Sequence, residues 1–300
     1  MARTVDPTTS SSTPVDEIAV DHLDPPQEPP PLPAPQLVKY LQDVTIVESI
    51  GADGQLKSTS FFYITASDEV YFGGTAENKR EVTIPEINAV LQRVPDEDIY
   101  AKLPTDDINN IELTLARETL VDESSIYVKR PGLQWYEDMI GTGYCPKALL
   151  DETMIMETIS KTPHPNIVRY HRCRVQRGYI TSIVLKWLDK TLDQYASTPG
   201  FDKLDKVNFF DELKPAVDYL HSLGLAHNDP NPQNIMVREE EDGSPVLIDF
   251  DSCQPFGKRL QPSGTEGWYE NPFFTSEKEH DVYILWRKSK NGSTLPNRWL

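Results

Sequence analysis

Short apolar runs alternate along the chain with turn-forming residues and with longer segments in which apolar side chains recur every three or four positions. The short runs are rich in Val, Ile, Phe and Tyr, which predicts strands. They are residues 44–50, 61–65, 70–72, 126–129, 180–188, 235–237 and 246–248. The longer segments predict helices at 83–95, 149–159 and 206–223. The pattern along the whole chain therefore predicts a mixed α+β protein.

Two of these helices carry specific signals. Thr83 can cap the first helix and Pro85 lies in its first turn. The expected apolar face of that helix ends at Pro95 and contains Ile87, Val90, Leu91 and Val94. The third helix has Pro215 in its interior. Because an interior proline costs a straight helix about 3 kcal/mol, we expect a kink or a break near Glu212.

The first 36 residues differ from the rest in composition. They hold nine prolines among Ser, Thr, Asp and Glu, and they end in the run Pro29 to Pro35. Such a segment cannot bury a core, which predicts disorder over residues 1–36. It serves either as an unbound polyproline spacer or as a PxxP ligand for an aromatic groove in a partner.

Composition narrows the classes of function. The net charge of -18 argues against a nucleic-acid partner or an anionic membrane surface, and a bound nucleotide would need a metal and local lysines. No apolar stretch of about 18 residues and no signal-peptide pattern occurs, so neither a membrane span nor secretion is expected. Cys145, Cys173 and Cys253 are odd in number and widely spaced, which fits a reducing compartment. We expect an intracellular protein, cytoplasmic or nuclear.

A candidate for chemistry lies around the predicted hairpin of residues 235–237 and 246–248. Asn234 precedes its first strand, and Asp249 follows its second. Because a hairpin returns on itself, these two side chains should lie side by side, with Asp229 close by. Oxygen ligands of this kind suit Mg²⁺ that also carries substrate phosphates. The sequence therefore predicts an ATP-phosphate and Mg²⁺ site.

Over roughly residues 126–286 the order of motifs resembles the eukaryotic protein-kinase-like superfamily. Tyr127-Val128-Lys129 resembles the strand with the phosphate-anchoring lysine, and Glu152 resembles its ion-pair partner, with Glu157 as a competitor. The segment 164–168 resembles the turn after that helix. The next strand resembles the one that runs into the adenine-binding hinge, with Leu185 as gatekeeper followed by Lys186, Trp187 and Leu188.

The resemblance extends to the catalytic motifs. It implies that Asp229 is the catalytic base, that Asn234 and Asp249 hold Mg²⁺, and that Lys129 with Glu152 holds the phosphates of ATP. His227 resembles the first residue of the catalytic loop, and Asp281 resembles the aspartate that supports this loop from a central helix. The segment 264–269 resembles the loop that contacts a peptide substrate. A protein substrate with a Ser or Thr hydroxyl is therefore expected.

Five features depart from an ordinary active kinase. No glycine lies between Gly74 and Gly132, so a glycine-rich phosphate loop is missing or unconventional. Asn231 stands where a lysine usually neutralises the transferred phosphate. Asn228 replaces the arginine that pairs with an activation-segment phosphate. Asp251 replaces the glycine of the Asp-Phe-Gly motif, where it could ligate a metal. The fifth departure is a C-lobe that looks shortened after Asp281.

The resemblance implies a two-lobed fold with a β-rich N-lobe and a mainly helical, shortened C-lobe. We expect a disordered tail at 1–36, an N-terminal hairpin and helix extension at 37–125, an N-lobe core at 126–187 and a C-lobe at 188–300. An ATP- and Mg²⁺-dependent Ser/Thr-directed phosphotransferase is the first hypothesis. A pseudokinase-type nucleotide-binding or scaffolding module without transfer activity is the second. A small-molecule phosphotransferase similar to aminoglycoside or choline kinases is the third.

Overall fold

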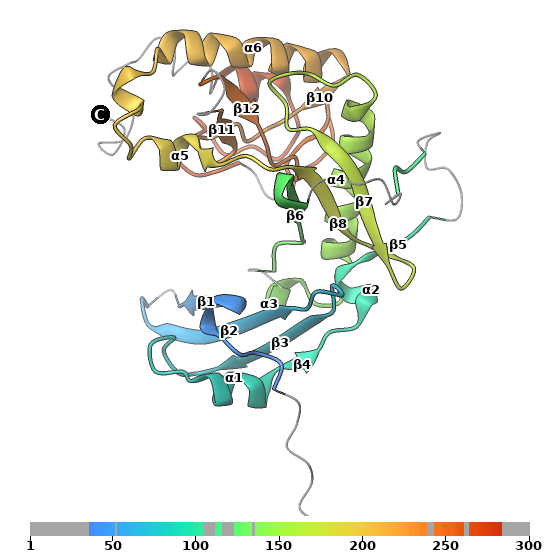
Figure 1. The fold of residues 1–300 in the computed structure, drawn as a ribbon, viewed down its shortest axis with the longest axis vertical. Coiled ribbons are helices and arrows are strands. Elements are labelled where there is room, and N and C mark those ends of the chain that lie inside the picture. Colours follow the sequence, from blue (N-terminus) through green and yellow to red (C-terminus); the bar gives the residue numbers. More distant parts are fainter. Residues whose placement is uncertain are drawn as a thin grey trace, which may run out of the picture. The chain divides into compact units, whose positions relative to one another are not determined.

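The computed structural model describes residues 36–51, 53–104, 112–115, 123–133, 136–238, 243–260 and 264–283. The predicted disordered tail, apart from Gln36, and the residues after Tyr283 lie outside this part of the chain. The chain divides into two units, Met1–Leu37 and Val38–Leu300. The description below concerns the second unit (Figure 1).

The first sheet of this unit is an antiparallel meander in the order β1-β2-β3-β4. It is preceded by the 3-10 turn Leu41–Asp43. Its strands are β1 (Thr45–Ile50), β2 (Leu56–Ile64), β3 (Val70–Thr75) and β4 (Gln92–Arg93). Helix α1 (Ile84–Val90) connects β3 to β4, and the short helix α2 (Asp96–Ile99) follows (Figure 1). Strands β2 and β3 include the predicted runs 61–65 (up to Ile64) and 70–72, and they form a hairpin in which Ile64 pairs with Val70.

Helix α1 is shorter than its apolar pattern predicts. It begins after Thr83 with the capping box that Glu86 completes, but it ends at Val90, and Gln92 then pairs with β3. Leu91 and Val94 are buried outside the helix, so their assignment to its apolar face is wrong. The pairing with β3 competes with helix continuation, because each added residue of helix would remove a sheet hydrogen bond.

Packing of α1 on the sheet depends on one glycine. A Cβ atom on Gly73 would lie 2.6 Å from the carbonyl oxygen of Val90, which is closer than any real contact allows. Gly73 therefore lets the backbone of α1 approach β3 directly.

The second sheet is built around β8 (Tyr179–Lys186). Strand β7 (Tyr170–Gln176) pairs along one edge of β8, while β5 (Ala101–Lys102) and β6 (Ile126–Lys129) pair along the other. The β7–β8 turn has positive φ at Arg177 (51°) and Gly178 (82°), which matches the right-handed twist of a tight hairpin. Helices α3 (Tyr136–Met139) and α4 (Tyr144–Ser160) lie between β6 and β7 in the chain.

A buried carboxylate joins the β2–β3 turn to this second sheet. Asp68 is fully buried and its φ is 59°. Its Oδ1 accepts a hydrogen bond from Arg130 Nε at 2.9 Å, and its Oδ2 accepts one from Thr181 Oγ1 at 2.9 Å. Arg174 Nη1 lies 3.6 Å from the same Oδ2. Since Arg130 directly follows Lys129, this contact holds the end of β6 in place.

The remaining elements form a mainly helical region. They are β9 (Lys190–Thr191), α5 (Leu192–Tyr195), a 3-10 turn (Phe201–Lys203), α6 (Lys206–Ser222), β10 (Leu225–Ala226), β11 (Ile235–Val237), β12 (Pro245–Leu247) and β13 (Gln254–Pro255). Residues 278–283 are also helical. Helix α6 runs through Pro215 without interruption, so of the expected kink or break near Glu212 the break is wrong. The buried side of α6 holds the turns on both sides of the proline together.

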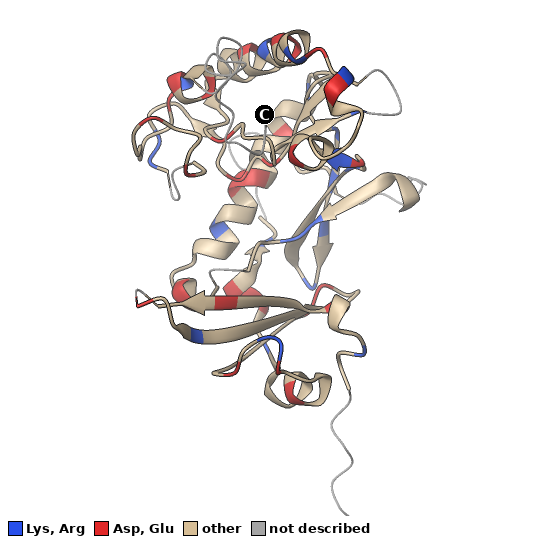
Figure 2. Cartoon of the chain, turned by 90° about the vertical axis from the view of Figure 1, so that its left-hand side faces the viewer, with Lys and Arg blue, Asp and Glu red and all other residues tan. Residues whose placement is uncertain are grey.

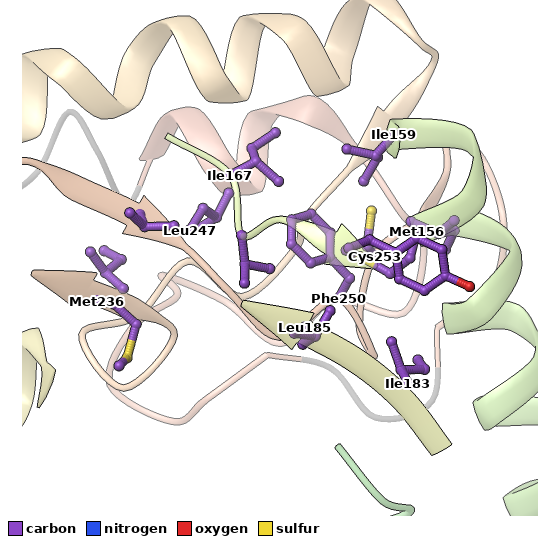
Figure 3. Packing of buried hydrophobic residues seen from close by; sticks show 14 of the residues in the cluster. Met156, Ile159, Ile167, Ile183, Leu185, Met236, Leu247, Phe250 and Cys253 are labelled. Atoms are coloured by element: carbon purple, nitrogen blue, oxygen red, sulfur yellow. The ribbon is translucent and has the colours of Figure 1, made fainter. Parts of the chain in front are cut away.

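One buried cluster joins α4, β8 and the hairpin of β11 and β12 (Figure 3). Its members include Met156, Ile159, Ile167, Ile183, Leu185, Met236, Leu247, Phe250 and Cys253. Phe250 is 1% exposed, which fixes the position of its neighbour Asp249 at the edge of this core. The mixed α+β class predicted from the sequence is confirmed.

Charged residues are spread over both sheets and the helices (Figure 2). Over the described residues no helix is both long enough and apolar enough to cross a bilayer.

Candidate active site

The hairpin of β11 and β12 has the geometry that the sequence predicts. Ile235 pairs with Leu247, and Val237 pairs with Pro245. At the open end, the backbone N–H of Ile248 donates to the carbonyl of Asn234 at 2.9 Å. Asn234 and Asp249 are therefore placed at neighbouring strand ends.

Lys129 connects strand β6 to two carboxylates. Its Nζ lies 2.5 Å from Glu152 Oε1 on α4 and 2.6 Å from Asp249 Oδ1 after β12. The Glu152 side chain is 7% exposed, and its Oε1 also accepts the backbone N–H of Phe250 at 3.1 Å. Residues 120 positions apart in the sequence thus meet in one ion-pair network.

The network shifts the pKa of each partner. Burial opposes the charge on Lys129, but the carboxylates of Glu152, Asp249 and Asp251 outweigh it and raise the lysine pKa. The pKa of Glu152 is raised, first by burial, although Lys129 acts against this shift. Burial would also raise the pKa of Asp249, but Lys129 lowers it below its usual range. A charged lysine between carboxylates can hold phosphate oxygens.

The competitor Glu157 has a different environment from Glu152. Its carboxylate accepts hydrogen bonds from the Thr114 hydroxyl at 2.9 Å and from the Tyr170 hydroxyl at 2.7 Å. The structure therefore brings Glu152, and not Glu157, to Lys129.

Asp229 contacts the segment that resembles a peptide-substrate loop. The backbone N–H and the hydroxyl of Thr265 donate to the two carboxylate oxygens of Asp229 at 2.9 Å and 2.8 Å. Asn234 Nδ2 donates to the Asp229 carbonyl at 3.0 Å, and Asn231 Nδ2 donates to the Thr265 hydroxyl at 2.9 Å. The sequence reasoning placed this loop near the substrate but did not identify the Thr265 contact, because nothing local links residues 36 positions apart.

A second, buried network supports the loop that carries Asp229. Asp281 is fully buried, and its carboxylate accepts the backbone N–H of Asn228 at 2.7 Å and that of His227 at 2.9 Å. His221 Nε2 donates to the same carboxylate at 2.9 Å. His227 Nε2 donates to the carbonyl of Ile248 at 3.0 Å. This loop is thereby tied to the segment that carries Asp249.

Asn228 makes contacts that the sequence reasoning missed. Its φ is 67°, a left-handed conformation that Asn tolerates better than most residues. Its Nδ2 donates to the Ala226 carbonyl, the Ser252 carbonyl and the Ser276 hydroxyl at 2.9–3.0 Å, and His280 Nδ1 donates to its Oδ1 at 3.1 Å. The neutral amide therefore bonds directly to the segment that follows Asp249. A single polar residue at a loop position is the one sequence signal for this role.

The residues expected at the nucleotide base lie at the end of β8. Leu185 is buried and pairs with Tyr127 of β6. Trp187 is 50% exposed, and its ring centroid lies 6.2 Å from that of Tyr127, which was not among the predicted site residues. Lys186 is exposed and Leu188 is half-buried. Alternation along a strand places Tyr127 on the same face of β6 as Lys129, which gives that face an aromatic side chain and a cation two residues apart.

The donor atoms near Asn234 and Asp249 fit a magnesium ion. Asn234 uses its amide nitrogen toward Asp229, which leaves its carbonyl oxygen for another partner. Asp249 uses Oδ1 toward Lys129. One amide oxygen and a carboxylate of low pKa form the hard oxygen set that Mg²⁺ shares with phosphates. Among the residues that the structure describes, no group of three or more His, Cys, Asp and Glu side chains forms a further metal centre.

Comparison with known proteins agrees with this architecture. The family model described as a protein kinase domain matches residues 137–282. The chain is 30% identical over 164 residues to the serine/threonine-protein kinase/endoribonuclease IRE1 of Hypocrea jecorina, covering 49% of this chain and 12% of that protein. It is 31% identical over 132 residues to the probable serine/threonine-protein kinase mkcB of Dictyostelium discoideum, covering 43% of this chain and 18% of that protein. It is 28% identical over 142 residues to the serine/threonine-protein kinase SRK2G of Arabidopsis thaliana, covering 44% of this chain and 39% of that protein.

The chain thus contains a domain of the protein-kinase-like superfamily, with a β-rich part and a helical part. It spans less than two fifths of the length of each of these three relatives. Lys129 lies before the matched residues, so its place in the site depends on the ion pairs described above.

Proposed function

We propose that the chain is an ATP- and Mg²⁺-dependent phosphotransferase that acts on Ser or Thr hydroxyls of proteins. The observation that carries this proposal is the contact of Lys129 with both Glu152 and Asp249. Lysine held between two carboxylates, one of them at a metal position, is the arrangement that a kinase needs for phosphate binding.

Each residue has a defined part in the proposed reaction. Lys129 binds phosphate oxygens of ATP, and Glu152 holds that lysine in place. Asn234 and Asp249 hold Mg²⁺, which when bound neutralises phosphate charge. The acceptor hydroxyl forms the new P–O bond as the bond to the leaving ADP oxygen breaks, and Asp229 accepts its proton. The adenine of ATP contacts Leu185, Lys186, Trp187 and Leu188.

The contact of Thr265 with Asp229 supports a protein substrate. Thr265 belongs to the segment that resembles the peptide-substrate loop, and it places a hydroxyl against the proposed base. In the absence of substrate this contact occupies both carboxylate oxygens of Asp229, so an acceptor hydroxyl must share or replace one of these bonds. We expect Thr265 to move or to rotate when the substrate binds.

A nucleotide-binding module without transfer activity is the second candidate. It is favoured by the lack of any glycine between Gly74 and Gly132 and by Asn231 at the position of the usual lysine. Both features weaken charge stabilisation of the transferred phosphate while leaving the Lys129 network intact.

The two candidates are separated by measuring binding and transfer on the same protein. Thermal stabilisation by Mg-ATP and phosphate transfer to a mixture of Ser- and Thr-containing peptides are compared for wild type, Lys129→Met and Asp229→Asn. The matched control is Lys57→Met, an exposed lysine on β2. The kinase proposal expects Asp229→Asn to keep at least half of the stabilisation and to lose transfer by about 100-fold or more.

Lys129→Met is expected to lose the stabilisation, whereas Lys57→Met keeps both properties. Stabilisation of the wild type without any transfer selects the second candidate. No stabilisation of the wild type by Mg-ATP contradicts both.

A further inference from the structure

A cavity of about 680 Å³ lies beside the end of β8 and shares Lys186 and Leu188 with the residues proposed to contact adenine. Its wall comes from the end of α4, the loop of residues 163–168, the start of β7, the end of β8 and the hairpin of β11 and β12. None of Lys129, Glu152, Asp229 and Asp249 lines it. Its volume is in the range of ordinary ligand-binding cavities.

The charge of this wall is opposite to that of the chain. The 16 lining residues include His164, Arg169, His171, Lys186 and Arg238, and no Asp or Glu is among those that the structure describes. The whole chain has 47 acidic and 29 basic residues, so the described part of this wall departs from the general composition. We call this feature the basic cavity.

The two histidines of the wall have lowered pKa values. Burial lowers the pKa of His164, and burial together with the charges of Arg169 and Arg172 lowers the pKa of His171. A nearby carboxylate would act in the opposite direction. Both rings are therefore neutral at pH 7, and the positive charge of the basic cavity comes from Lys and Arg.

The cations differ in how far they are engaged within the chain. Arg238 donates to the carbonyl of Pro165 and to the Ser244 hydroxyl. Lys186 also has a partner within the chain. Arg169 is exposed, and over the described residues its guanidinium has no hydrogen bond or ion pair. Arg169 is thus the cation that is ready to pair with a ligand.

The rest of the wall is largely apolar. Met156, Ile159 and Ile167 belong to the buried cluster seen in Figure 3, and Val168, Leu188 and Val246 also line the cavity. A ligand that fits must therefore present apolar groups to this surface and negative charges to its cations.

We propose that the basic cavity is a docking site for a peptide segment of a partner protein in which Asp or Glu alternates with large apolar side chains. The cations come from three separate parts of the chain, Arg169 directly before β7, Lys186 at the end of β8 and Arg238 directly after β11, so they match carboxylates spaced along a chain better than one compact dianion. The apolar wall supplies pockets for the intervening side chains.

The test measures binding of a labelled 12-residue peptide that alternates Asp and Leu, by fluorescence anisotropy with the whole chain. Two control peptides replace either all Asp or all Leu by Ser. The chain is compared with Arg169→Glu and with Lys57→Glu, which makes the same charge change on β2, away from the cavity. Thermal unfolding verifies that each variant is folded.

The proposal expects saturable binding of the Asp-Leu peptide and at least tenfold weaker binding of both Ser controls. Arg169→Glu should weaken binding about tenfold or more, and Lys57→Glu should change it less than twofold. Equal weakening by the two variants would show a general charge effect and overturn the proposal. Absence of binding, or displacement of the peptide by micromolar inorganic phosphate, would overturn it as well.

Discussion

At the scale of single residues, Asn228 joins three segments through its side-chain amide. Asn228→Ala would leave three acceptors without their donor and place at φ 67° a residue that tolerates this conformation less well than Asn, so we expect a loss of about 2–4 kcal/mol in unfolding free energy. Asn228→Gly removes the same hydrogen bonds without the backbone strain and should lose about 1 kcal/mol less. Urea unfolding of both variants checks this. Equal stability of Asn228→Ala and wild type would refute it.

The Lys129 network predicts a pH dependence. Lys129→Met leaves Glu152 buried without its cation, which raises the pKa of Glu152 further. A raised carboxyl pKa favours folding at low pH, and this contribution is lost as the pH rises above the ordinary value of the group. The variant should therefore lose about 3 kcal/mol at pH 8 and clearly less at pH 5.

Denaturant unfolding of Lys129→Met at the two pH values measures this effect. The double variant Lys129→Met, Glu152→Gln should recover part of the loss at pH 8, because it removes the unpaired charge. A loss of stability that is the same at both pH values would contradict the ion pair between Lys129 and the buried Glu152.

At the scale of elements, Asp68 fastens the β2–β3 turn to the second sheet. Asp68→Asn keeps a residue that tolerates φ 59° but removes the charge that pairs with Arg130 and Arg174. We expect a loss of about 2–3 kcal/mol in unfolding free energy, because the carboxylate is fully buried. The control variant is Asp96→Asn, which removes the more exposed ion pair with Arg177. We expect it to lose about 1 kcal/mol or less in unfolding free energy. A smaller effect at Asp68 than at Asp96 would contradict this.

Helix α6 is continuous although it contains Pro215. Because proline has no backbone N–H, the helix lacks one hydrogen-bond donor at this position. Pro215 is exposed, so Pro215→Ala removes no core packing. We expect it to stabilise the protein by about 1–2 kcal/mol, since the restored hydrogen bond outweighs the larger entropy of the unfolded chain. Its neighbour Lys214→Ala, in an exposed ion pair, should change stability by less than about 0.5 kcal/mol. A thermal melt that shows Pro215→Ala less stable than wild type would disprove this.

At the scale of the whole molecule, the net charge of -18 produces self-repulsion in the folded state. Raising NaCl from about 0.02 to 0.3 M screens this repulsion, because the Debye length falls below about 10 Å. We therefore expect the melting temperature to rise by a few degrees. Scanning calorimetry at the two salt concentrations measures the shift. An unchanged or lower melting temperature would show that charge repulsion does not limit the stability of the folded state.

Much of the local structure was predictable because its causes are local. The strands Ile126–Lys129 and Ile235–Val237 occur where β-branched runs predict them, and the capping residue Thr83 begins its helix. The helix end was not predictable, since β4 forms only when β3 is available to pair with it. The break near Glu212 that Pro215 suggested does not occur, because packing that an isolated helix lacks holds α6 together.

The sequence by itself determined the positions of the longer strands and helices, the order of kinase-like motifs and the meeting of Asn234 and Asp249 at a hairpin, because each depends on residues close together in the chain. Only the tertiary structure decided which glutamate reaches Lys129, that Thr265 bonds to Asp229, that Asp68 joins two sheets and that cations gather in one cavity. These contacts join residues tens of positions apart. Their geometry depends on how whole elements pack, and no periodicity in the sequence encodes it.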